Sequence, residues 1–139
     1  MAEQVIGLSL QQFVQDEATR MLVSSVVNSV RLLGKDRQVD YRCDSPEEKR
    51  FMRMRVSLQG NGKVKLCHEL LSSEPMAESF ATEAVAREQA HYNRCSLCNR
   101  VEIKGVWLEP DDQVLQALPQ PCPVYHGICP ICRERVMLG

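Results

Sequence analysis

Two cysteine pairs of the form C-x-x-C are the residues of this chain best suited to chemistry. Cys95 and Cys98 form the first pair, Cys129 and Cys132 form the second, and 30 residues separate the two pairs. Four thiolates around one ion make the closed, tetrahedral kind of site that structural zinc occupies. We therefore predict one zinc ion held by these four cysteines. Iron accepts the same four thiolates, so the sequence leaves iron open as the alternative.

The region that carries these pairs, residues 94–139, is small enough to need such a site. It has only 46 residues, and domains of about that size are usually stabilised by a metal, a disulfide or a partner. His126 lies three residues before Cys129 and is a candidate hydrogen-bond donor to a metal-bound thiolate, or an alternative ligand. The other three cysteines, Cys43, Cys67 and Cys122, are expected to be small buried apolar residues.

The same cysteines also allow a redox reading. Pro130 is a favourable first residue for a helix running to Leu138, with Cys129 just before it. Backbone N–H groups and the helix dipole would then stabilise a thiolate, as a metal ligand or as a redox nucleophile. A thiol-based redox sensor therefore remains an alternative, although the region lacks the strand-helix alternation of a thioredoxin-like unit.

Composition indicates a soluble globular protein. The chain has 139 residues, 44% of them hydrophobic and 25% charged, with a net charge of −1. No run is long enough to span a bilayer, and the N-terminus lacks the pattern of a secretion signal. Seven cysteines, an odd number, argue against a fully disulfide-paired secreted framework. We expect a cytoplasmic protein, in which thiols stay reduced and paired cysteines indicate metal or redox chemistry.

The N-terminal segment, residues 1–73, predicts one long helix and three strands. Apolar residues at helical spacing (Leu22, Val26, Val30, Leu33, widened by Val23 and Val27) predict a helix over residues 16–33, ended by Gly34. A short helical turn capped by Ser9 precedes it. Alternating apolar residues predict strands at 39–43, 50–58 and 63–71, with a turn at 59–62. The expected fold class is α+β: a long helix packed on a three-stranded antiparallel sheet, followed by a small zinc-stabilised module.

The remaining boundaries follow from composition. Residues 74–93 are polar and alanine-rich, and Pro75 can open a helix, so this segment is predicted to be a linker helix. Residues 94–139 are then the four-cysteine zinc module.

Two stretches resemble parts of bacterial sensory proteins. Residues 14–20 and the run from Tyr41 to Met54 (YRCDSPEEKRFMRM) resemble the C-terminal half of PAS-like domains. The first C-x-x-C pair and the run His126-Gly-Ile-Cys-Pro-Ile-Cys resemble a small module that often follows PAS domains in signalling proteins. This resemblance implies a strand around Trp107 and a helix from Asp111 to Leu118 between the two motifs. A full PAS domain has further strands and helices before its long helix, whereas this chain starts almost at that helix. The resemblance therefore implies a half-PAS unit in a sensory or regulatory setting, without a particular ligand.

No catalytic constellation is present, so we expect a non-enzymatic regulatory adaptor of a bacterial signalling system, with no haem or flavin. Its expected partners are a second copy of the chain, bound through the N-terminal segment, and a signalling protein that the sequence does not identify. Val27→Glu is expected to dissociate such a dimer. Substitution of Cys98 or Cys132 by Ser is expected to unfold the zinc module and leave the N-terminal segment largely intact.

A nucleic-acid-binding zinc protein is the remaining alternative. It rests on four basic residues of two adjacent predicted strands, Arg53, Arg55, Lys63 and Lys65. The net charge of −1 and the low aromatic content of 5% disfavour nucleic acid as a partner.

Overall fold

The structure is a computed structural model, and it describes residues 2–5 and 17–138. The short turn predicted around Ser9 lies outside the described residues. The elements, in chain order, are β1 (Ala2–Val5), α2 (Glu17–Leu33), β2 (Arg37–Arg42), β3 (Glu48–Leu58), β4 (Val64–Pro75), β5 (Thr82–Ala84), the 3₁₀ turn η1 (Arg87–Gln89), β6 (Tyr92–Cys95), β7 (Val101–Ile103), β8 (Val106–Leu108), α3 (Gln113–Gln116), β9 (Cys122–Gly127) and α4 (Pro130–Leu138).

Helix α2 buries the apolar stripe that its sequence predicts. Its buried side chains are Thr19, Leu22, Val23, Val26, Val27 and Val30. The prediction for Leu33 is wrong, because 69% of this residue is exposed where the helix ends. Gly34 follows with φ of +67°, and its N–H donates to the Val30 carbonyl at 2.9 Å. A residue in this left-handed conformation at a helix end favours glycine.

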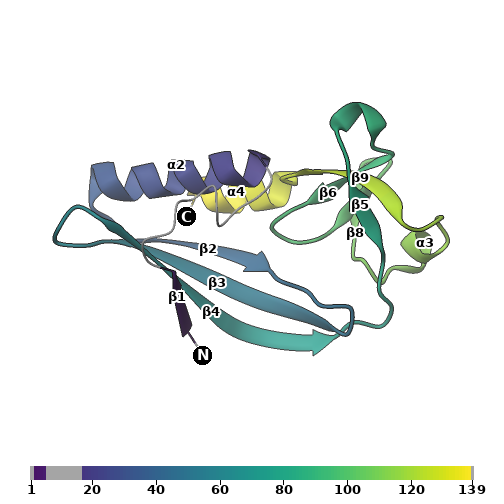
Figure 1. Ribbon diagram of the computed structural model, residues 1–139, viewed down its shortest axis with the longest axis horizontal. Coiled ribbons are helices and arrows are strands. Elements are labelled where there is room, and N and C mark those ends of the chain that lie inside the picture. Colours follow the sequence, from purple (N-terminus) through teal and green to yellow (C-terminus); the bar gives the residue numbers. More distant parts are fainter. Residues whose placement is uncertain (1, 6–16, 139) are drawn as a thin grey trace.

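The first sheet contains the predicted three-stranded antiparallel meander and one further strand. Its order is β1-β4-β3-β2, with β1 at the free edge of β4. Side chains opposite one another share a face of a sheet. Val39, Met54 and His68 form one such row beneath α2, and Val56 pairs with Leu66 in the next. Helix α2 covers this face of the sheet, and α4 lies beside it (Figure 1).

A second sheet packs around its own small core. Its order is β5-β9-β6-β7-β8, with β9 parallel to both of its neighbours and the remaining pairs antiparallel. One face carries the second core, formed by buried Phe80, Val101, Leu115, Cys122 and Val124. This sheet contains the predicted strand around Trp107, as β8. The predicted helix over 111–118 is shorter than expected: α3 begins after Asp112, whose carboxylate accepts from the Val114 N–H.

The linker helix predicted for residues 74–93 is wrong. Strand β4 runs on to Pro75, and β5 and η1 occupy the rest of the segment. A helix over residues 74–93 would have few apolar residues to bury along one side. In the structure, Phe80 from this segment is buried in the second core instead. The backbone also bonds to β9: Val85 N–H donates to Val124, and Cys122 N–H donates to Ala81. Tertiary pairing therefore overrides the local propensity of this alanine-rich segment.

The two sheets meet in one shared core. Buried residues of α2, β2, β3 and β4 belong to the same cluster as Cys95, Leu97, Cys129, Cys132 and Val136. The end of β2 is tied to this region directly, because the Arg42 N–H donates to the Leu97 carbonyl at 2.6 Å. Arg37, also on β2, donates to the carbonyl of Val136 and to the Ser29 hydroxyl. The contact with Val136 ties α4 to the first sheet beside α2.

Candidate metal centre

The first cysteine pair lies in the tight turn between β6 and β7. Cys95 ends β6, and its carbonyl accepts from the Asn99 N–H at 2.9 Å, while its own N–H donates to Arg100 at 2.8 Å. Asn99 has φ of +68°, a left-handed conformation that Asn adopts more readily than most residues. The turn therefore brings Cys98 back beside Cys95.

The second pair lies at the start of α4, as predicted. The helix begins at Pro130, and the Arg133 N–H donates to the Cys129 carbonyl at 3.0 Å. The Cys132 N–H lies 3.4 Å from Cys129 Sγ. Cys129 thus accepts a backbone hydrogen bond from the first helical turn, which is the arrangement expected to stabilise a thiolate.

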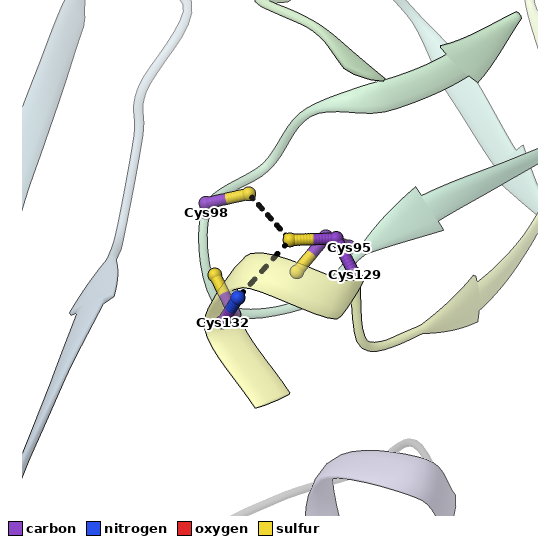
Figure 2. A group of neighbouring side chains, drawn as sticks. All are labelled: Cys95, Cys98, Cys129 and Cys132. Carbon is purple, nitrogen blue, oxygen red and sulfur yellow. Dashed lines mark hydrogen bonds between the residues drawn. The ribbon is translucent and has the colours of Figure 1, made fainter. Parts of the chain in front are cut away.

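The structure brings the four predicted cysteines together. Their Sγ atoms all lie within 4.8 Å of one another, and Figure 2 shows the two pairs side by side, with Cys98 Sγ 3.8 Å from Cys129 Sγ. Four thiolates bound tetrahedrally at about 2.3 Å from a zinc ion would be about 3.8 Å apart. The spacing of the thiols therefore fits a four-coordinate metal ion.

Burial makes this a closed site. Cys95, Cys129 and Cys132 are buried, and Cys98 is half-buried. A thiolate in such surroundings needs a cation or hydrogen bonds to offset its desolvation. A metal ion bound where the four sulfur atoms converge would supply that cation.

Mutual hydrogen bonding splits the acidities of the thiols. Hydrogen bonds from Cys132 and Cys98 lower the pKa of Cys95 far below its ordinary value, although burial opposes this. Cys132 is its counterpart: the hydrogen bonds to Cys95 and Cys98, together with burial, raise its pKa. The hydrogen bond with Cys132 lowers the pKa of Cys98, but the hydrogen bond with Cys95 and burial outweigh it and raise the pKa to about 12. Because a metal ion binds thiolates, its binding to this cluster has to release the protons of those thiols that are not already ionised.

His126 is placed on β9, opposite Arg94 of β6. Its Nδ1 atom lies 3.5 Å from the Ser96 hydroxyl, inside the first cysteine turn, and it is not one of the four clustered ligands. Its contact with Ser96 places it against the turn that holds two of the thiols. Of the other cysteines, Cys122 is buried as expected, but Cys43 is exposed and Cys67 is partly exposed.

A network of ion pairs beside the site escaped the sequence reasoning. Glu109 lies at its centre and pairs with Arg42 at 2.8 Å, with Arg100 at 2.9 Å and with Lys49 at 3.2 Å. Arg42 also pairs with Asp44 and Lys49 with Asp111. The network joins β2 and β3 of the first sheet to the second unit. The charged residues of the network are not spaced regularly in the sequence. The pairs that join the two units are about 60 residues apart, so no local sequence pattern could reveal the network.

The network shifts the acidities of its carboxylates. Burial would raise the pKa of Glu109, but hydrogen bonds and charge from Arg42 and Arg100 outweigh it, so the pKa lies below its ordinary value. Asp44 shows the same balance between burial and its hydrogen bonds from Arg42 and Asn99. Both carboxylates are therefore ionised at neutral pH and stabilise the junction in that form.

A cleft of about 720 Å³ separates the first sheet from α4, and the cysteine site forms part of its wall. Cys98 and Cys132 line it together with apolar residues such as Phe51 and Ile131. The half-buried Cys98 is thus the thiol of the cluster most accessible to a reagent in this cleft.

Two of the four basic residues on the predicted strand face are paired with acidic neighbours. Arg53 pairs with Asp40 at 2.8 Å, and Arg55 with Glu69 at 3.4 Å. This pairing weakens the nucleic-acid alternative in the form that the sequence suggested.

Comparisons with protein families, curated proteins and solved structures found no match for this chain. Among the helices that the structure describes, none has the length and apolar character required to cross a membrane.

Proposed function

We propose that this chain is a non-enzymatic regulatory adaptor in which zinc, bound by Cys95, Cys98, Cys129 and Cys132, holds two small sheets together as one partner-binding unit. One observation carries the proposal: the four thiols converge within 4.8 Å inside the core that both sheets share. A closed site with four protein ligands leaves no position for substrate, which is the pattern of structural zinc.

The regulatory setting rests on the resemblance to half-PAS units. A long helix on an antiparallel sheet is compatible with that resemblance, and the cysteine module follows it in the chain.

Metal loss tests the structural role. Because Cys95, Leu97, Cys129 and Cys132 share a cluster with α2, we now expect removal of zinc to destabilise the N-terminal segment as well as the module. Binding of zinc to such sites contributes about 10–16 kcal/mol to folding. Far-UV circular dichroism during titration with a strong chelator should show loss of helix along with release of zinc. Unchanged helix content after complete metal removal would show that the ion has no structural role.

A thiol-based redox sensor is the second candidate, and the position of Cys98 favours it. This thiol is half-buried in the wall of the cleft, whereas its three neighbours are buried. Peroxide would then oxidise Cys98 to a sulfenic acid, which would condense with a neighbouring thiol to a disulfide with loss of water, and zinc would be released. Zinc release measured with a chromogenic chelator during peroxide treatment separates the candidates. Release at low peroxide that dithiothreitol reverses supports sensing, whereas zinc that stays bound supports the structural role alone.

Self-association is the proposed first partnership. The outer side of α2 exposes Met21 by 67% and Leu32 by 83%, and a groove follows this side of the helix. A twofold dimer would bury these residues most simply. Val27 is unsuitable for the test, because it is buried against the sheet and a charge there would disrupt the core. Leu32→Glu should instead convert a dimer to a folded monomer in light scattering, and a wild-type monomer at micromolar concentration would end this part of the proposal.

A further inference from the structure

The face of the second sheet opposite its core carries a row of side chains unlike the rest of the surface. Trp107, Glu102, Asn93 and Tyr125 are opposite one another on β8, β7, β6 and β9. Cross-strand partners project from the same face of a sheet. The row therefore presents an aromatic ring at each end and two polar groups between them.

Strand alternation separates this row from the second core. Val124, the neighbour of Tyr125 in sequence, is fully buried in the second core, and successive strand residues point to opposite faces. Tyr125 and Trp107 remain partly exposed, and the buried part of Trp107 packs against the core that the two sheets share. The chain has one Trp and three Tyr in all, so the presence of two such rings in one row is a concentration of a scarce residue type.

A hollow of about 580 Å³ lies along this row, and cationic side chains border it. Arg87 and Arg133 both line the hollow, from η1 and α4. The Arg87 guanidinium lies 4.7 Å from the centre of the Tyr125 ring. Both arginines are exposed, and none of the ion pairs among the described residues involves either of them. This contrasts with Arg53 and Arg55 on the first sheet, which are paired.

The middle of the row offers groups that can read a base edge. The Asn93 amide donates to Glu102 Oε1 at 3.0 Å, which fixes both side chains relative to the strands. The Asn93 carbonyl and the second Glu102 oxygen remain as acceptors, and a carboxylate accepts from exocyclic amino groups of bases. Glu102 is the one acidic group among the described residues that line the hollow, so it would repel a phosphate placed at the centre of the row.

We propose that this face binds single-stranded nucleic acid. Bases stack on Trp107 and Tyr125, and phosphates contact Arg87 and Arg133 at the rim. Single-stranded nucleic acids are bound in this way, by aromatic stacking platforms combined with positive charge. Three strand spacings separate the two aromatic residues, about 14 Å in all, so one base cannot stack on both. A chain of nucleotides is therefore the occupant rather than a free nucleotide.

Trp107 provides the measurement, because it is the only Trp of the chain. The full-length, zinc-loaded protein is titrated with a six-nucleotide oligocytidylate, whose bases carry exocyclic amino groups, while Trp fluorescence is followed, and cytidine monophosphate is titrated separately. We expect saturable quenching by the oligonucleotide, weaker in higher salt. Absence of saturable quenching by the oligonucleotide would overturn the proposal. Equal affinity for cytidine monophosphate would also overturn it, since a single nucleotide would then be the occupant.

Variants test whether the row itself is the site. Tyr125→Ala and Arg133→Ala should each weaken oligonucleotide binding, roughly tenfold for the lost stacking platform, whereas Tyr125→Phe should retain binding. Arg31→Ala is the matched control, because Arg31 is an exposed arginine on α2 that does not line the hollow. Binding unchanged by Tyr125→Ala and Arg133→Ala would contradict the assignment. Zinc content is measured on each sample, so failure of this proposal is distinguishable from failure of the metal centre.

Discussion

At the scale of single residues, the proposed metal site depends on which sulfur atoms converge. Cys132 belongs to the cluster of four, whereas Cys122 is equally buried but lies in the second core. We predict that Cys132→Ser abolishes stoichiometric zinc binding, because three thiolates cannot close the tetrahedral site. Cys122→Ser, the control of matched burial, should keep its zinc. Elemental analysis of the purified variants measures both, and full zinc occupancy in Cys132→Ser would refute the ligand assignment.

The ion pairs around Glu109 make a second prediction at this scale. The Glu109 side chain is 29% exposed and contacts three cations, so it is intermediate between surface pairs and buried pairs. We expect Glu109→Gln to lower the free energy of unfolding by about 2 kcal/mol at pH 7. Urea unfolding followed by circular dichroism measures the change. A loss below about 0.3 kcal/mol would show that the network contributes nothing at the junction.

Acid should reduce the difference between wild type and Glu109→Gln. The pKa of Glu109 is depressed in the folded protein, so its contribution is complete above the unfolded value, about 4.3, and falls as pH drops through the folded pKa. The stability difference should therefore be the same at pH 7 and pH 5 and should narrow below about pH 4. A stability difference that widens as the pH falls would contradict the predicted lowering of the pKa of Glu109. Thiolate protonation affects both proteins alike and cancels in the comparison.

At the scale of elements, sequence periodicity predicted the parts that bury one clear face. Helix α2 and strands β3 and β4 appear where alternation or helical spacing is strong, and both cysteine turns are in place. Strand β1 was missed because four residues, Ala-Glu-Gln-Val, have no alternation to read. The segment after Pro75 was misread because its strand pairing is with β9, about 40 residues later in the chain. Long-range pairing of this kind leaves no local signal.

The two sides of α2 allow a matched test of its packing. Val30 lies on the buried side of α2 and is fully buried, whereas Leu32, two residues later, is 83% exposed. We predict that Val30→Ala lowers the free energy of unfolding by about 2 kcal/mol, through lost apolar contacts and a cavity. Leu32→Ala should change it by less than about 0.5 kcal/mol. Urea unfolding of both variants checks the difference, and equal effects would mean that the helix is packed on the sheet by another face.

At the scale of the whole molecule, the shared core shows that the two segments are packed together and are not separate units. The sequence divides the chain into a sheet unit and a cysteine module, and each does have its own sheet. The metal site, however, lies in the cluster that α2 packs against, and Arg42 of β2 bonds to the first cysteine turn. That union could not be read from sequence, because it depends on contacts between segments about 55 to 110 residues apart.

An ion bound at the four cysteines would therefore link the two units rather than stabilise one alone. This predicts a single cooperative transition for the zinc-loaded chain, since the cluster cannot separate without exposing buried residues of both sheets. Thermal unfolding should coincide when followed by circular dichroism of the backbone and by fluorescence of Trp107 in the second sheet. Two transitions well separated in temperature would show that the units fold independently.

Native mass spectrometry of protein purified without added metal tests the central claim most directly, because it weighs the ion and counts disulfides together. The account predicts one zinc ion per chain, with no disulfide among the seven cysteines, and loss of that ion alone in Cys132→Ser. A folded wild-type chain that carries no metal, or one whose four clustered cysteines are joined as two disulfides, would contradict it.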